Sequence, residues 1–347
     1  MVTALGFTRG DICSELGLVM PSFCRHNHLV QNCPICSREQ HVELRPVVTG
    51  GTRAEAAAAT PRRATPARPG STGGRARPGV TVRRMARGVD DGYRSELVPG
   101  LKSSADAERL ALELAWAMMR LEVLATEPPG LYAEIADANG DPEQRTWLAF
   151  LIAYLGPLPG AEPFAEIQRV RVAWPPEALP ELEGAQAGER TSLQAGRAAR
   201  TIAAYRSWAR RSGSQAAALI GDEAWMPERR FARAYERVGL PGLQRGSRFD
   251  LLVTLGHTGV YELRAGTLAL GGSDPVTVAA KRVLGIGDPI LLERRAIDLA
   301  QACGVPLEAL DVGLFNWERG HRAMLGMPVG LEADPGRADV ARSALGV

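Results

Sequence analysis

Apolar residues recur at spacings of three and four along the C-terminal two thirds of the chain. Between Asp106 and Ala125 the apolar positions are Leu110, Leu114, Ala117, Leu121 and Leu124. This period matches one face of an α-helix, so we predict an amphipathic helix over this stretch.

Further helices are predicted from the same pattern at 142–154, 193–211, 228–238, 246–256, 275–284 and 289–303. The first of these begins with Asp141 as a good N-cap and Pro142 in the first turn. It ends at the Gly-Pro-Leu-Pro-Gly run 156–160. Only the short runs 260–263 and 268–270 resemble strands. The predicted fold class is therefore mainly α.

Composition divides the chain of 347 residues into four parts. Residues 1–43 are rich in Cys and His, and residues 44–104 are rich in Arg, Pro and Gly without apolar periodicity. We expect the second part to be a disordered linker. A helical domain over 105–330 and a C-terminal tail over 331–347 complete the expected organisation, and the oligomeric state stays open.

The linker carries the strongest local charge. It holds nine arginines between Thr52 and Val89, against the single acid Glu55, although the whole chain has a formal net charge of only +2. Two interpretations are open: a solvated linker, or a basic arm that follows DNA phosphates. The arginines are Arg53, Arg62, Arg63, Arg68, Arg75, Arg77, Arg83, Arg84 and Arg87.

The N-terminal part has the spacing of a zinc site. Cys33-x-x-Cys36 lets two thiolates reach one tetrahedral ion, and Cys24 supplies a third ligand. We expect His28 to be the fourth, with His26 as the alternative. Four protein ligands leave no open position, so the predicted zinc is structural.

No stretch of about 18 apolar residues is present, and the N-terminus lacks the charged-then-apolar pattern of a signal peptide. We therefore expect no membrane partner and a cytoplasmic location. If the chain binds DNA, that location is the nucleoid.

The segment 283–292 has the pattern of a DNA-binding hairpin. Gly285-Ile286-Gly287 lies between two predicted helices, where backbone N–H groups at the start of the second helix can bind a phosphate. Lys281 and Arg282 precede the turn and are further candidates for DNA contacts. Arg245 and Arg248 flank another glycine turn, where they could contact DNA or cap the helix that follows. Arg248 is the candidate for a DNA contact there.

The residues from the hairpin onward resemble the helix-hairpin-helix DNA glycosylases of the endonuclease III type. Within this superfamily the chain looks most like the branch named for α-glutamyl/putrescinyl-thymine pyrophosphorylases. The resemblance covers roughly residues 105–330. It is carried by Leu284, Gly285, Ile286 and Gly287 on the hairpin, and by Pro306, Leu310, Asp311, Leu314 and Phe315 on the run that follows.

The resemblance implies an enzyme that flips a modified base out of double-stranded DNA and cleaves its N-glycosidic bond. Asp311 then holds the catalytic position, where a carboxylate stabilises an oxocarbenium-like sugar or activates water. The alternative for Asp311 is an N-cap of a helix beginning at Val312. Asn316, Trp317 and Tyr154 are candidates for the base pocket, and core packing is the alternative for Trp317. Asp250 is a further, weaker pocket candidate.

Two departures from the family pattern change the expected chemistry. Pro289 stands where bifunctional glycosylases have a lysine, so no Schiff base forms and we expect a monofunctional enzyme. No cysteine follows Cys303, so no iron–sulfur cluster is expected. Asp288 stands where a phosphate would approach the hairpin.

The sequence is therefore compatible with three functions. The first is a base-excising glycosylase in DNA repair or in defence against phages with hypermodified DNA. The second is a non-catalytic, zinc-containing DNA-binding module. The third is a thymine-hypermodification enzyme of the pyrophosphorylase type.

Overall fold

The computed structural model describes residues 88–347 except 177, 195 and 223. The chain divides into two compact units, 1–78 and 79–347, and all described residues belong to the second. The predicted zinc module and the linker as far as residue 87 lie outside the described residues, and with them the ligands expected there.

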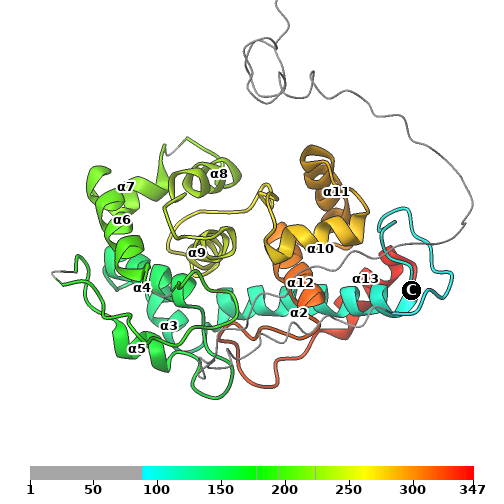
Figure 1. Cartoon of the computed structure of the whole chain (residues 1–347), viewed down its shortest axis with the longest axis horizontal. Coiled ribbons are helices and arrows are strands. Elements are labelled where there is room, and N and C mark those ends of the chain that lie inside the picture. Colours follow the sequence, from blue (N-terminus) through cyan, green and yellow to red (C-terminus); the bar gives the residue numbers. More distant parts are fainter. Residues whose placement is uncertain (1–87, 177, 195, 223) are drawn as a thin grey trace, which may run out of the picture. The chain divides into compact units, whose positions relative to one another are not determined.

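The described unit is built from helices, which confirms the mainly α fold class (Figure 1). The described residues contain no strand. The helices are α2 (Ser104–Thr126), α3 (Leu131–Ala136), α4 (Pro142–Leu155), α5 (Ala165–Val170), α6 (Ala198–Arg211), α7 (Gln215–Ile220), α8 (Pro227–Arg237), α9 (Arg245–His257), α10 (Pro275–Leu284), α11 (Pro289–Ala302), α12 (Leu307–Arg319) and α13 (Pro335–Leu345).

Local capping explains where several predicted helices begin. The Asp141 carboxylate accepts a hydrogen bond from the Glu143 N–H at 3.1 Å, and Pro142 occupies the first turn of α4. Helix α6 begins at Ala198, five residues later than expected, because Gly196 adopts a positive φ of 74° that interrupts the helix.

The two runs that resemble strands form a loop between α9 and α10. Side chains take the place of a neighbouring strand there: Glu308 accepts a hydrogen bond from the Ala265 N–H at 2.7 Å, and Glu293 accepts from the Leu268 N–H at 3.0 Å. Glu293 also accepts from the Leu270 N–H. The N–H groups of Val260 and Tyr261 donate to the Leu255 carbonyl of α9. Carboxylates and this carbonyl therefore satisfy the backbone donors, and no sheet is needed.

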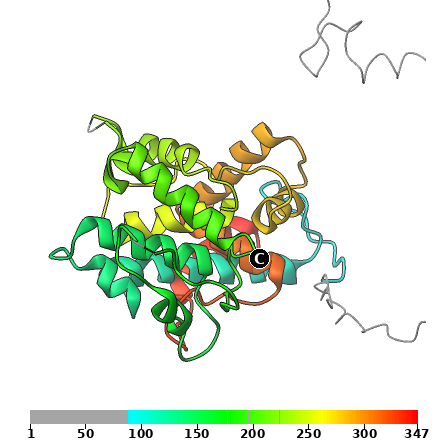
Figure 2. The ribbon, with the colours of Figure 1, turned by 60° about the vertical axis from the view of Figure 1, so that its left-hand side comes forward.

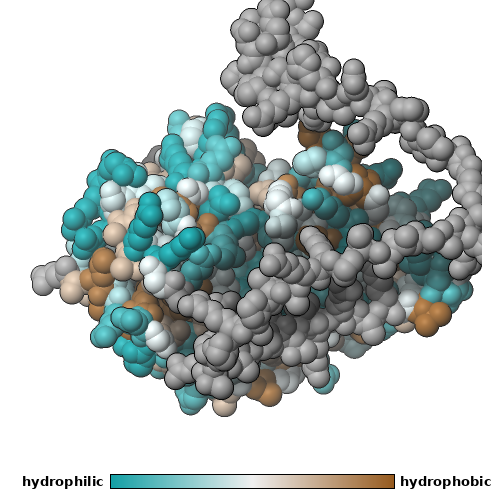
Figure 3. Space-filling view, viewed as in Figure 1, coloured by the Kyte–Doolittle hydropathy of each residue, from teal (hydrophilic) through white to brown (hydrophobic). Residues whose placement is uncertain are grey.

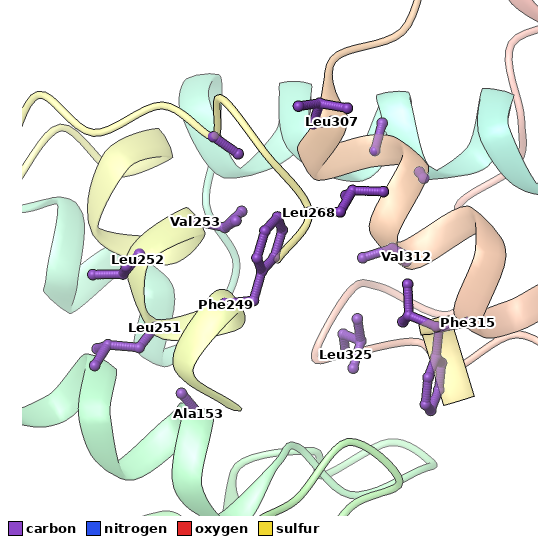
Figure 4. Packing of buried hydrophobic residues seen from close by; sticks show 14 of the residues in the cluster. Ala153, Phe249, Leu251, Leu252, Val253, Leu268, Leu307, Val312, Phe315 and Leu325 are labelled. Carbon is purple, nitrogen blue, oxygen red and sulfur yellow. The ribbon is translucent and has the colours of Figure 1, made fainter. Parts of the chain in front are cut away.

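The core joins α2 to α12 and α13, and α4 to α9. Helix α4 is buried on all sides from Arg145 to Leu155, which suits the apolar run that begins at Trp147. In Figure 4 the Phe249 ring of α9 lies between its own helix and Leu268 of the following loop, with α12 beyond. At Gly313 a Cβ atom would lie 2.7 Å from Leu114, so the glycine allows α12 and α2 to approach closely.

One expectation at the C-terminal end is wrong. Helix α12 begins at Leu307, so Asp311 lies inside it and does not cap a helix beginning at Val312. Within the C-terminal segment 331–347, residues 335–345 form α13, which packs against α2. In Figures 1 and 2 the pair α10 and α11 stays on the far side of the unit from α4–α7.

Candidate functional site

Asp311 lies at the centre of the described unit with its carboxylate fully buried. It accepts a hydrogen bond from Arg245 Nη1 at 2.6 Å through one oxygen. The other oxygen accepts from Arg190 Nη2 at 2.8 Å. Two guanidinium groups therefore enclose the residue that the sequence singled out.

A second carboxylate completes this cluster. Arg190 binds Asp250 through both Nε at 2.7 Å and Nη2 at 2.9 Å, a bidentate geometry. Arg245 donates to the Leu268 carbonyl through Nε at 3.1 Å. We call Arg190, Arg245, Asp250 and Asp311 the Arg–Asp network.

Opposite charges in the network fix the protonation of Asp311. Burial alone raises the pKa of this carboxyl, but the charges and hydrogen bonds of Arg245 and Arg190 outweigh burial and hold it below the ordinary 3.8. Asp311 is therefore ionised at neutral pH and has both oxygens occupied. It is poorly suited to accept a proton from water, and well suited to orient the two arginines.

A cleft of about 90 Å³ opens above the network. It is lined by charged and polar side chains and by one aromatic ring. Its volume is several times that of a single water site, so it has room for a small planar group. The lining residues are Glu189, Arg190, Thr191, Gln244, Gly246, Ser247, Asp274, Pro275, Val276 and Phe315.

Three features give the cleft chemical character. The Arg190 guanidinium lies 4.7 Å from the centre of the Phe315 ring, so a cation and an aromatic surface adjoin the same space. Gln244 is exposed, and its side-chain amide forms no hydrogen bond with the described residues. Glu189 is partly exposed and contacts His321 Nε2 at 2.7 Å.

The other cleft carboxylate, Asp274, is already engaged. One of its oxygens accepts from the N–H groups of Val276 and Thr277 at 3.2 Å and caps α10. The same oxygen lies 3.8 Å from Arg245 Nη1, which links the cap to the network. Glu189 is therefore the cleft carboxylate with fewer fixed partners.

The three base-pocket candidates lie in the core and do not line this cleft. Asn316 donates to Glu113 at 3.0 Å and accepts from the Ala323 N–H at 3.1 Å. Trp317 donates through Nε1 to the Asp106 carbonyl at 2.9 Å, in agreement with the alternative of core packing. Tyr154 is fully buried beside Phe150.

The predicted hairpin has two helices, α10 and α11, joined by residues 285–288. Gly285 adopts φ 66°, the left-handed conformation that ends α10, and a Cβ at Gly287 would meet nothing within 4 Å. However, the Asp288 carboxylate accepts from the N–H groups of Ile290 at 3.0 Å and Leu291 at 2.9 Å. The backbone N–H groups that were expected to bind a phosphate thus already donate to the Asp288 side chain.

The basic candidates near the hairpin and the cleft also have partners. Arg282 pairs with Glu318, and Lys281 lies 3.5 Å from the Gly272 carbonyl oxygen. Ile286 is half-buried in the turn. Arg248 lies over the Tyr235 ring, 4.5 Å from its centre, so part of its side chain covers α8.

Sequence reasoning missed the residue that connects the network to the cleft. Arg190 lies in the loop 171–197, outside every predicted helix, and no motif marks it. Arg245 was weighed as a DNA contact or a helix cap, and it instead pairs with Asp311 from the first residue of α9. Asp250 was noted as a pocket candidate, and it reaches the site through Arg190.

Within residues 88–347, as far as they are described, no group of three Cys, His, Asp or Glu side chains is arranged to hold a metal. In the same part of the chain no helix is both long and apolar enough to cross a membrane. No family model, no curated protein and no solved structure matches this chain. Function must therefore be argued from the site itself.

Proposed function

We propose that this protein is a monofunctional DNA glycosylase that takes an extruded, modified base into the cleft above the Arg–Asp network. The observation that carries the proposal is the adjacency of Arg190, Phe315 and Gln244 around one opening. An aromatic ring stacks on a planar base, an amide reads its hydrogen-bonding edge, and a guanidinium binds an electron-rich ring.

The proposed reaction is hydrolysis. Water adds to the sugar carbon C1′ as the C1′–N bond breaks, and the departing base leaves with the bonding electron pair before it takes up a proton. Arg190 is held in place by Asp250 and Asp311, and its charge stabilises the negative charge that develops on the base. Glu189 is the carboxylate that would accept the proton from water.

This assignment changes the role of Asp311. Asp311 acts as a positioning residue that orients Arg190 and Arg245. The charge that acts on the departing base is that of the Arg190 guanidinium. Pro289 remains at the position where a lysine would form a Schiff base, so strand nicking is not part of the proposal.

Gly246 offers a test that leaves every charge in place. A Cβ atom there would lie 3.7 Å from Arg190 Nη2, an ordinary contact, and a longer side chain would extend into the cleft. We expect Gly246→Leu to abolish base excision while Gly246→Ala retains it. The assay incubates plain, uracil-containing and hypermodified phage DNA with the protein and then treats it with alkali to reveal abasic sites.

A second candidate is a DNA-binding module without catalysis, and the complete burial of Asp311 favours it. The same assay separates the two. Alkali-sensitive breaks made by the wild type and lost in Gly246→Leu support the glycosylase. DNA binding by the wild type without breaks on any substrate would overturn it in favour of the module.

The structural zinc stays part of the proposal for residues 1–43. Metal analysis of the full-length protein is expected to find about one zinc per chain, because four N-terminal ligands are available. Cys33→Ser should lose the zinc, whereas Cys303→Ser, a change at a cysteine remote from the motif, should keep it. Equal zinc in both variants would exclude the proposed site.

A further inference from the structure

Exposed arginines form stripes on two helices, α6 and α8, that both pack against α7. Residues 197–237 contain nine arginines and four acidic residues, against a net charge of only +2 for the whole chain. Seven of these arginines are exposed. Six of them, all except Arg210 on α6, make up the two stripes, and we call these six the α6–α8 arginine face. They are Arg197, Arg200, Arg211, Arg229, Arg233 and Arg237.

On α8 the stripe follows from spacing. Arg229, Arg233 and Arg237 are four residues apart, so their side chains lie on one side of the helix. Like charges at this spacing repel each other and destabilise an isolated helix. Of these three arginines, only Arg233 has a carboxylate partner among the described residues. That partner is Glu236 at 2.9 Å, and its carboxylate is itself exposed.

The stripe on α6 is made in the same way. Arg197, Arg200 and Arg211 lie at offsets of three and fourteen residues, close to whole turns of a helix. None of them forms an ion pair with a residue that the structure describes. Arg197 donates to Gln194 at 3.2 Å and Arg211 to Ser207 at 3.2 Å, which are neutral partners.

Partly buried arginines near the C-terminus have carboxylate partners. Arg322 pairs with Glu113 at 3.0 Å, Arg337 with Glu122 at 2.7 Å, and Arg342 with Glu108 at 2.6 Å. Their charges are neutralised within the chain. Exposed arginines without an ion pair to a described residue also occur elsewhere, as at Arg264, Arg294 and Arg295. The α6–α8 arginine face differs from them in number, because five of its six arginines lack such an ion pair.

The two helices are connected to the cleft through neighbouring helices. Helix α7 packs against both α6 and α8, and α8 packs against α9, whose first turn lines the cleft. Hydrophilic side chains cover the region of the surface where Figure 1 places α6–α8 (Figure 3). The Trp225 ring lies 4.8 Å from the Arg229 guanidinium and supports it from one side.

We propose that the α6–α8 arginine face binds the phosphate backbone of duplex DNA, and that it replaces the hairpin in this role. The inference rests on the proposed function for its choice of DNA as the polyanion. At the hairpin the Asp288 carboxylate already binds the amides and repels a phosphate. On the α6–α8 arginine face the guanidinium groups, except that of Arg233, have no carboxylate partner among the described residues and can form bidentate contacts with phosphates.

The test compares two triple variants of the full-length protein with equal loss of charge. Arg200→Gln/Arg211→Gln/Arg229→Gln removes part of the face. The control, Arg264→Gln/Arg294→Gln/Arg295→Gln, removes three other exposed arginines that form no ion pair with described residues, two of them on hairpin helix α11. Affinity for a fluorescent 30-base-pair duplex is measured by anisotropy at several salt concentrations.

We expect the face variant to bind about tenfold or more weakly, and its slope of log K against log salt to fall by roughly two to three, since each phosphate contact contributes about 0.9. The control should stay within about twofold of the wild type. Equal losses in both variants, a loss in the control alone, or wild-type binding by the face variant would overturn the proposal.

Base excision measured on the same samples keeps the two proposals apart. If the face variant binds like the wild type while excision persists, the surface is wrong and the glycosylase stands. If the face variant loses binding and the wild type never excises a base, the surface stands and the glycosylase fails. A wild type that does not bind duplex DNA overturns both.

Discussion

The Arg–Asp network and the α6–α8 arginine face use the same residue type in opposite surroundings. In the network, Arg190 and Arg245 are buried, and the carboxylates Asp250 and Asp311 neutralise them. On the face, arginines such as Arg200 and Arg229 are exposed and lack a described carboxylate partner. Burial requires a compensating charge, because an unpaired ion in the interior is strongly destabilising.

The comparison distinguishes charged residues that stabilise the fold from charged residues that are available to a binding partner. A buried pair fixes geometry and tolerates little change. An exposed, uncompensated charge contributes almost nothing to stability and keeps its full capacity to bind an anion. Substitutions in the network should therefore change the free energy of unfolding, and substitutions on the face should change the affinity for DNA. The two effects should be independent of each other.

Asp311→Asn should have the largest effect. It leaves two buried guanidinium groups with too little negative charge, and we expect a loss of about 3–5 kcal/mol in the free energy of unfolding. Urea denaturation followed by circular dichroism measures it. Asp298→Asn on α11, a half-exposed aspartate without an ion pair, is the matched control and should change stability by less than about 0.5 kcal/mol. Equal stability of the two variants would contradict the role of the network.

As the pH falls, the free energy of unfolding should decrease because of His257 before Asp311 takes up a proton. Burial lowers the pKa of His257 to about 4, with help from Arg120 and Arg264, so the unfolded chain takes up this proton first. Stability is complete above the unfolded value of about 6.5 and is lost as the pH falls towards 4, by at most about 3 kcal/mol.

The comparison with His257→Gln isolates this contribution. Unfolding curves at pH 7.5 and pH 5 should differ more for the wild type than for the variant. The lowered pKa of Asp311 places its loss of stabilisation below 3.8, so the network should not titrate in this window. An identical pH dependence of the two proteins would show that His257 is not the responsible group.

Asp288→Ala should cost about 1 kcal/mol, because α11 loses the side chain that caps it. Asp288→Asn keeps an acceptor for the Ile290 N–H and should be close to neutral for stability. Both variants remove a negative charge from the hairpin. If the hairpin lies on DNA, Asp288→Asn binds more tightly than the wild type; if the α6–α8 arginine face carries the binding, the affinity changes little.

Neutralising the face should change stability least. Arg200→Gln/Arg211→Gln/Arg229→Gln removes no described ion pair, and we expect a change within about 0.5 kcal/mol in urea denaturation, in either direction. Retained stability together with weaker DNA binding would confirm the contrast between the two regions. A loss of several kcal/mol would show that these arginines have a structural role.

Much of the helical fold could be predicted from the sequence. Apolar periodicity located α2, α8, α9, α10 and α11 to within about two residues at each end, and a favourable cap with a first-turn proline located α4. These signals are local, because a helix bonds within a few residues of itself. The strand-like runs form no sheet for two reasons. Glu293 binds the backbone of 268–270, and the run 260–263 bonds to the Leu255 carbonyl of α9.

The candidate site could be predicted only in part. Asp311 was found through its place after the hairpin, and Asp250 was noted as a weak candidate. Arg190 lies 121 residues before Asp311 and Arg245 lies 66 before it, so neither pairing leaves a local pattern. The sequence alone therefore suggested that the Asp311 carboxylate is available for catalysis. In the structure two guanidinium groups enclose it.

The sequence by itself determined that the described part of this protein is helical, because helix formation depends on near neighbours and on apolar spacing. It also placed Asp311 and the turn 285–288. Only the tertiary structure decided what these features do. It buried Asp311 against Arg190 and Arg245, let Asp288 bind the hairpin amides, and left the arginines of α6 and α8 exposed. Charge pairing acts through space, and the fold alone sets which charges meet.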